Sequence, residues 1–267
     1  MLTTLALVGV MTLAPAQGGL ALENVRITYG ELGAPRPDNS LLPGDIFFLA
    51  FDIKNITVDP TGKVQYSMSM EVTNAAGAKV FEQKPVDRND FLPLGGNKLP
   101  ARAYVTVPLD QEPGTYSCKL VVIDKANKAE QSITQKFIVK QKQFGIVSLY
   151  TSSDAKGELP APPYGMTGQS VWVHFVVVLF DRDKTKKQPS LSVEMSTLSA
   201  DGMPTVPKPT ILEISSEVDE KDTGIPLRFL LPLNRPGKFT VQLKVTDKLT
   251  NKTSSVQLPI EVVPQPQ

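Results

Sequence analysis

The chain has 267 residues, of which 41% are hydrophobic, so it is long enough to bury two cores of about 120 residues each. Lys and Arg number 28 against 27 Asp and Glu, and this balance leaves no field that would attract nucleic acid or an anionic membrane. Cys118 is the only cysteine and His174 the only histidine, which excludes an intrachain disulfide and leaves few side chains for a hydrolytic triad or a zinc site.

The chain begins with an apolar run from Leu5 to Leu13, followed by Ala14-Pro15-Ala16. Small residues three and one positions before a cut suit signal peptidase, so we expect a signal peptide over 1–16 and a mature start near Gln17. No Lys or Arg precedes the run, which leaves a misassigned start codon or a buried strand as the alternatives. The run is too short to span a bilayer, and we expect no transmembrane segment further along.

Alternating apolar and polar residues dominate the first half of the chain, and helical periodicity is almost absent. We expect an opening strand over 25–29 and a second strand in which Phe47, Leu49 and Phe51 share one face. The inward positions of the later strands are Val64, Tyr66, Met68, Met70, Ala103, Val105, Val107, Tyr116, Cys118, Leu120, Val122, Ile133, Phe137 and Val139. The last two strands form a hairpin around the polar turn 124–128.

Nearly the same sequence returns about 124 residues later, as expected of a tandem repeat. GELGAPRP from Gly30 returns as GELPAPPY from Gly157, and PGTYSCKLVVIDK from Pro113 returns as PGKFTVQLKVTDK from Pro236. Pro108-Leu109-Asp110 has a similar counterpart in Pro232-Leu233-Asn234. The inward positions of the second half are Val171, Val173, Phe175, Val177, Leu179, Leu191, Val193, Met195, Leu227, Phe229, Leu231, Phe239, Val241, Leu243, Val245, Val256, Leu258, Ile260 and Val262.

Alternation of apolar and polar residues indicates antiparallel sheets with one face exposed to solvent. Two such sheets must stack to bury their apolar faces. We therefore predict an all-β fold of two tandem seven-stranded antiparallel β-sandwiches, related by internal duplication. The first sandwich covers 20–140 and the second 144–263, and a few polar residues join them. Residues 264–267 form a disordered tail.

The run Gly114-Thr115-Tyr116-Ser117-Cys118 is similar to the Gly-x-Tyr-x-Cys run that opens the sixth strand of immunoglobulin domains. Each half of the chain resembles a bacterial immunoglobulin-like or fibronectin-type-III-like module. The resemblance implies that the tyrosine hydroxyl ties a loop to its strand. The second half has Phe239 at the tyrosine position and therefore lacks that hydroxyl. Such modules act as stalks, adhesion units or positioning units, and the fold alone assigns no function.

The outward side of the second strand carries the candidate functional residues. Phe48 and Trp172 are out of phase with the core residues and occupy equivalent positions in the two halves, and His174 follows on the same face. Exposed aromatic rings stack on sugars or anchor protein interfaces. We expect a partner surface here, for a protein or a glycan. The alternatives are that a loop or the sister domain covers this face, or that the two faces are reversed.

Three other features are expected to have structural rather than functional roles. Cys118 points inward and is expected to be an inert core thiol. The acidic segments 86–90 and 218–222 suit solvated turns better than calcium loops, because each contains a basic residue and neither has EF-hand spacing. The proline-rich segments after Gly30 and Gly157 are expected to cover the sandwich ends, with Leu32 and Leu159 as plugs.

These observations predict an exported interaction or structural module, periplasmic, surface-bound or secreted, that is not an enzyme. The absence of disulfides fits bacterial export. We expect no cofactor and no metal, and no nucleic-acid partner. The alternatives are a carbohydrate-binding module that uses Phe48 and Trp172, and a hydrolase with an unrecognised pair of carboxylates.

Overall fold

The computed structural model describes residues 18–266, and within that range every regular element is a β-strand. The first half contains β1 (Ala21–Thr28), β2 (Ser40–Leu41), β3 (Ile46–Lys54), β4 (Lys63–Asn74), β5 (Lys79–Phe91), β6 (Lys98–Thr106), β7 (Gly114–Asp124) and β8 (Glu130–Val139). The second half contains β9 (Gly145–Ser152), β10 (Tyr164–Met166), β11 (Ser170–Val178), β12 (Leu191–Ser199), β13 (Thr210–Ile214), β14 (Gly224–Pro232), β15 (Gly237–Asp247) and β16 (Lys252–Val263). The expected signal peptide lies outside the described residues.

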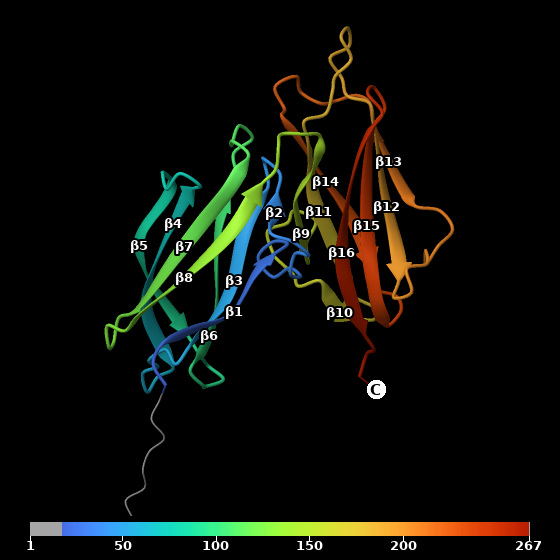
Figure 1. The fold of residues 1–267 in the computed structure, drawn as a ribbon. Helices are drawn as coiled ribbons and strands as arrows, with labels where there is room; N and C mark the ends of the chain where they lie inside the picture. The colour runs from blue at the N-terminus through green and yellow to red at the C-terminus, as the bar shows by residue number, and fades with distance from the viewer. Residues whose placement is uncertain (1–17, 267) are drawn as a thin grey trace, which may run out of the picture.

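Each half of the chain is a sandwich of a three-stranded and a five-stranded sheet (Figure 1). The orders are β1-β3-β6 against β2-β8-β7-β4-β5, and β9-β11-β14 against β10-β16-β15-β12-β13. Every pairing is antiparallel except β2 with β8 and β10 with β16. The predicted all-β double sandwich with immunoglobulin-like architecture is thereby confirmed. Each half has one short strand beyond the seven expected, because β2 and β10 are too short to produce an alternating pattern.

Each sandwich encloses its own apolar cluster, and the inward phases expected for β3 and β11 are confirmed except at Leu179, which follows the end of β11 and lies outside the second cluster. Phe47, Leu49 and Phe51 lie in the first cluster, and Val173 and Phe175 lie in the second. Cys118 is fully buried in the first cluster. Burial raises the pKa of its thiol to about 12, so the thiolate that reacts with oxidants or metals does not form near neutral pH.

The two halves agree in backbone conformation as well as in strand order. Non-glycine residues with positive φ recur at equivalent positions: Asn24 and Ser148 (52° and 53°), Asn55 and Leu179 (58° and 57°), and Lys128 and Asn251 (63° and 58°). This conformation is uncommon for residues other than glycine. Three matched pairs therefore mean that both sandwiches bend their strands and turns at the same places.

The expected match of Pro108-Leu109-Asp110 with Pro232-Leu233-Asn234, which makes Phe229 the counterpart of Val105, is wrong. Phe47 pairs with Val105, and its equivalent Val171 pairs with Leu231, so Val105 corresponds to Leu231 rather than to Phe229. The Pro-Leu-Asp and Pro-Leu-Asn tripeptides therefore do not occupy the same place. The loop that follows β14 is shorter than the loop that follows β6, and this length change shifts the sequence match by two residues.

The acidic segment 86–90 is part of the edge strand β5 and not a turn, contrary to expectation. Its Asp87 carboxylate lies 2.9 Å from Lys125 Nζ, and Asp90 accepts a hydrogen bond of 2.9 Å from the Tyr66 hydroxyl. Both faces of this half of β5 are exposed, so no alternation marked it as a strand. The segment 218–222 is a loop, held by Arg182, whose guanidinium donates to the backbone carbonyls of Asp219 and Asp222.

The expected tyrosine corner is present in the first sandwich. The Tyr116 hydroxyl donates a hydrogen bond of 2.8 Å to the Glu112 carbonyl and accepts one from Gln111 Nε2. The second sandwich has Phe239 in this position, and the Arg235 guanidinium lies 5.2 Å from the centre of its ring instead. A cation–π contact thus replaces the hydroxyl bond in the second half.

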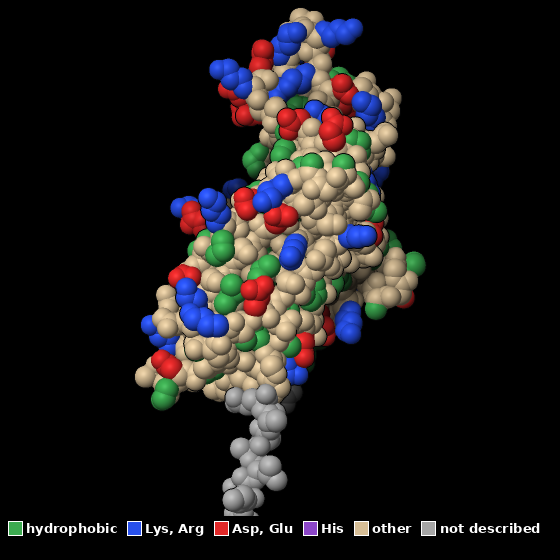
Figure 2. All heavy atoms as spheres, turned by 60° about the vertical axis from the view of Figure 1, so that its left-hand side comes forward, with side chains coloured by type: hydrophobic (Ala, Val, Ile, Leu, Met, Phe, Trp, Pro, Cys, Tyr) green, Lys and Arg blue, Asp and Glu red, His purple; other side chains and the backbone are tan. Residues whose placement is uncertain are grey.

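The described surface mixes charges of both signs. Figure 2 shows acidic and basic side chains interspersed over the visible face, with hydrophobic side chains scattered among them. No helix within residues 18–266 has the length and apolar character that crossing a membrane requires. Pro264–Pro266 follow the last strand without regular structure, and Gln267 lies outside the described residues.

Candidate interdomain site

The loop between β1 and β2, residues 29–39, joins the two sandwiches. It runs from the first sandwich toward β9 and β11 of the second (Figure 1). Tyr29 and Ala34 of this loop are buried in the apolar cluster of the second sandwich. No strand pairs across the boundary between the described halves, so this loop and its neighbours carry the contact.

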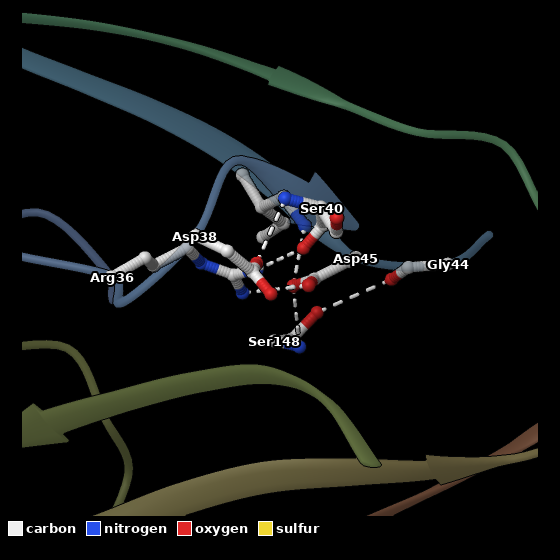
Figure 3. Close-up of polar contacts among 7 residues, drawn as sticks. Arg36, Asp38, Ser40, Gly44, Asp45 and Ser148 are labelled. Carbon is white, nitrogen blue, oxygen red and sulfur yellow. Dashed lines mark hydrogen bonds and ion pairs between the residues drawn. The ribbon is translucent and has the colours of Figure 1, made fainter. Parts of the chain in front are cut away.

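An ion pair at the base of this loop fastens the first sandwich to β9. Arg36 Nη2 lies 2.6 Å from Asp45 Oδ2, and the two side chains are only 8% and 6% exposed. The other carboxylate oxygen of Asp45 accepts a hydrogen bond of 2.9 Å from the backbone N–H of Ser148 in the second sandwich, and the Ser148 hydroxyl donates to the Gly44 carbonyl (Figure 3). A buried charge that is ion-paired and hydrogen-bonded on both sides resists separation, because removing one partner leaves the other without solvent.

The same arginine also contacts an aromatic ring. The Arg36 guanidinium lies 4.6 Å from the centre of the Tyr29 ring. Burial raises the pKa of Tyr29, and the positive charge of Arg36 opposes that rise only in part, so the phenol stays neutral near pH 7. Because Tyr29 is also packed in the second core, this cation–π contact connects the ion pair to that core.

A cleft of about 330 Å³ lies beside this ion pair, between the two sandwiches. Three aromatic residues line it: Phe48 and Tyr104 from the first sandwich, and Tyr150 from the second. The Phe48 and Tyr104 rings are cross-strand neighbours with centroids 5.4 Å apart. The remaining lining residues are Gly30, Glu31, Arg36, Asp45, Ile46, Ser148, Leu149, Gly157 and Pro160.

The glycines of the two repeated Gly-Glu-Leu segments both approach Tyr150. Gly30 and Gly157 have φ of 73° and 78°, and a Cβ atom on either would overlap the Tyr150 side chain. Glycine is required at both positions for conformation and for space. The repeated segments thus position one aromatic residue of the cleft. The expected plugging role of Leu32 and Leu159 is wrong, because these side chains are 41% and 61% exposed.

The structure separates the three candidate residues predicted from the sequence. Phe48 lies on the outer side of its sheet, half-buried, and lines the cleft. Trp172 is also half-buried on the outer side of its own sheet, outside both apolar clusters, with Arg228 5.7 Å from its ring centre. Trp172 does not line the cleft, so the two equivalent aromatic residues do not form one surface. Their role in binding a partner stays a prediction.

His174 is on the outer side of the sheet but is covered, so it cannot form part of an exposed surface. It is 7% exposed, its ring stacks on Tyr150 at 4.8 Å, and Nε2 lies 2.7 Å from the Ser152 hydroxyl. Burial lowers the pKa of His174, which keeps the imidazole neutral. The residue therefore supports Tyr150 from behind, and the alternative that a loop covers this face holds at His174.

Two carboxylates line the cleft, Glu31 and Asp45, and each has its own arginine. Glu31 lies 2.6 Å from Arg102 Nε, and Asp45 lies 2.6 Å from Arg36. In residues 18–266, no three His, Cys, Asp or Glu side chains gather in a way that could hold a metal ion.

No sequence family and no curated protein matches the chain. Red sea bream transglutaminase, a solved structure, is 7% identical with a TM-score of 0.28; the match covers 94% of this chain but only 32% of that enzyme. The C-terminal domain of the Streptococcus agalactiae antigen I/II polypeptide BspA is 9% identical with a TM-score of 0.30, over 90% of this chain and 100% of that one. The C-terminal domain of the Streptococcus pyogenes antigen I/II-family protein AspA is 9% identical with a TM-score of 0.31, over 91% and 100%. These low TM-scores assign neither a family nor a function.

Proposed function

We propose that the protein is an exported, non-catalytic interaction module in which two copies of one β-sandwich unit are held at a fixed mutual orientation. The observation that carries this proposal is the buried contact of Arg36 and Asp45 with Ser148, which joins the sandwiches at a charged, desolvated point. A flexible pair of modules would not need to bury an ion pair at its junction. Fixing the orientation makes the cleft between the sandwiches a preformed surface.

The partner surface in this proposal is the aromatic side of the cleft. Tyr104 is 62% exposed and packs against Phe48, so a large ring already has a rigid support and a free face. Aromatic side chains of this kind contribute much of the binding energy at protein interfaces because they bury large areas at low entropic cost. Glu31 lines the same cleft, and its ion pair with Arg102 adds a polar rim.

The proposal is tested by capture from the native host with the tagged full-length protein and two tyrosine variants. Tyr104 and Tyr164 are 62% and 60% exposed, so Y164A is a matched control for Y104A. We expect a protein that is enriched by the wild type and by Y164A and is lost with Y104A. Equal enrichment with all three would contradict a partner surface at the cleft.

A glycan is the second candidate partner, favoured by the three aromatic rings that line one cleft. Pyranose rings stack on aromatic faces, and a cleft of about 330 Å³ is within the range of small-molecule sites. A glycan array probed with wild type, Y104A and Y164A distinguishes the two candidates. Binding that only Y104A loses would favour a carbohydrate-binding module over a protein-binding one.

Export is the part of the proposal that rests on sequence alone, on the apolar run before Ala14-Pro15-Ala16. Fractionation of the native host followed by intact-mass measurement tests it. We expect the protein outside the cytoplasm with a start near Gln17. A cytoplasmic protein that retains residues 1–16 would refute export and leave the interaction proposal standing.

A further inference from the structure

A groove opens on the second sandwich at the side where β13 and β14 face each other. It has a volume of about 360 Å³ and leads to core residues of the second apolar cluster, among them Met195, Ile260 and Val262. Beside it lies Thr205, in the segment between β12 and β13, whose N–H donates to the Thr197 carbonyl. This groove is separate from the interdomain cleft and shares no lining residue with it.

The equivalent place in the first sandwich is nearly full. Only about 80 Å³ remains there, and the strand pairings, together with the hydrogen bond between Thr205 and Thr197, match part of its lining to that of the groove. The matched lining residues are Val72 with Thr197, Phe81 with Thr205, Val105 with Leu231, Tyr116 with Phe239, Phe137 with Ile260, and Val139 with Val262. One of the rings that line the first site is Phe81, which packs against the first core from the edge strand β5.

The groove therefore exists because two aromatic residues of the first sandwich are replaced by smaller ones. Phe81 becomes Thr205 and Phe137 becomes Ile260, and both changes remove ring volume from the same space. An apolar cavity of about 150 Å³ is enough to hold a benzene ring in a protein. The groove exceeds that volume and is open to solvent, so it has room for an aromatic ring.

A positive charge lies at the same groove. Arg235 lines it and contacts the Phe239 ring at 5.2 Å. Among residues 18–266, no carboxylate lies within ion-pair distance of this guanidinium. An entering segment with an acidic residue next to its aromatic one would complement both features of the groove.

We propose that this groove binds an aromatic side chain from an extended segment of another protein, with a neighbouring carboxylate of that segment paired to Arg235. Phe81 in the first sandwich shows how a ring from an edge strand occupies this place. The inference adds a second site to the proposed interaction module and rests on that function. It is tested at Met195, far in the chain from Tyr104, so the groove proposal and the proposed function at the cleft can fail separately.

The test uses the full chain with methyl-labelled methionine and the acetylated peptide Lys-Val-Phe-Glu-Gln, a copy of residues 79–83. We expect the Met195 methyl signal to shift in a saturable way, while Met68 and Met70 in the first core stay unchanged. The same peptide with alanine in place of phenylalanine should bind at least tenfold more weakly. No Met195 shift at millimolar peptide would overturn the proposal, even if capture through Tyr104 succeeded.

Two variants separate the ring from the charge. T205F restores the residue type of the first sandwich, so it should fold, fill the groove and weaken the peptide at least tenfold; unchanged affinity in folded T205F would overturn the site. R235Q should weaken binding of the peptide at least threefold but leave binding of a peptide with glutamine in place of glutamate unchanged. If R235Q and the wild type bound the glutamate peptide with equal affinity, the carboxylate pairing would be overturned. A Met195 shift that depends on protein concentration alone, with a dimer in sedimentation equilibrium, would assign the groove to a second copy and overturn the other-protein partner.

Discussion

Asp124 and Asp247 occupy the same place in the two sandwiches and make the same two hydrogen bonds. Both are fully buried at the ends of β7 and β15. Asp124 accepts N–H bonds from Thr57 and Ala126 at 2.8 and 2.9 Å, and Asp247 accepts them from Asp181 and Leu249 at the same distances. Each carboxylate thus ties the loop after β3 or β11 to the following hairpin, and no lysine or arginine takes part.

The first prediction concerns this pair of aspartates. D124N and D247N should each lower the free energy of unfolding by about 1–3 kcal/mol, because an amide presents N–H donors where the backbone also presents donors. Urea unfolding followed by circular dichroism measures both. D110N is the control, since Asp110 is exposed. A cost in only one of the two variants would show that the sandwiches do not depend on the same contact.

The second prediction concerns the ion pair between the sandwiches. D45A should lower the free energy of unfolding by about 3–5 kcal/mol, because Arg36 would remain buried without its partner. D38N changes an exposed aspartate in the same loop and should cost less than about 0.5 kcal/mol. Loss of stability as small in D45A as in D38N would mean that the pair contributes nothing to the junction.

The third prediction concerns the single histidine. Its imidazole should titrate below the ordinary 6.5, because burial disfavours the charged form. Between the lowered folded pKa and the ordinary unfolded pKa, the unfolded chain binds more protons, so stability falls as the pH drops below 6.5. Proton NMR gives the pKa without assignment, since only one histidine is present. H174Q should lose this part of the pH dependence, and a pKa at or above 6.5 would refute the burial argument.

The fourth prediction concerns Trp172. W172A should lower the free energy of unfolding by about 1 kcal/mol, because the ring lies outside both clusters, whereas F175A should cost about 3–5 kcal/mol. The tryptophan emission should be quenched by acrylamide. A blue-shifted emission that resists quenching, together with a cost for W172A like that of F175A, would place the ring in a core.

Much of the fold could be predicted from alternation, since strands with one buried face repeat with period two. This pattern correctly placed Phe47, Leu49 and Phe51 inside and Phe48 outside. It failed for β5, where both faces are exposed, and for the correspondence of β6 with β14, where a length change in the next loop misled the sequence match.

The cleft could be predicted only in part. The outward position of Phe48 follows from the alternation of its strand. Tyr104 and Tyr150 come from strands whose neighbours are set by the sheet order and by the contact between the sandwiches, so their place in the cleft could not be predicted. His174 was expected on the surface because phase assigns a side of the sheet and not what covers it. The sequence does contain a sign of the ion pair. Asp45 corresponds to Gln169 in the second half, so the two copies differ at the position where the junction forms.

The fixed orientation of the two sandwiches is measured most directly by residual dipolar couplings of backbone N–H groups in the full chain. With Arg36 and Asp45 paired, one alignment tensor should fit the couplings of residues 21–139 and 145–263 together. In D45A the two sets should need different tensors while each sandwich keeps its own internal fit. Different tensors for the two sandwiches already in the wild-type protein would contradict the account.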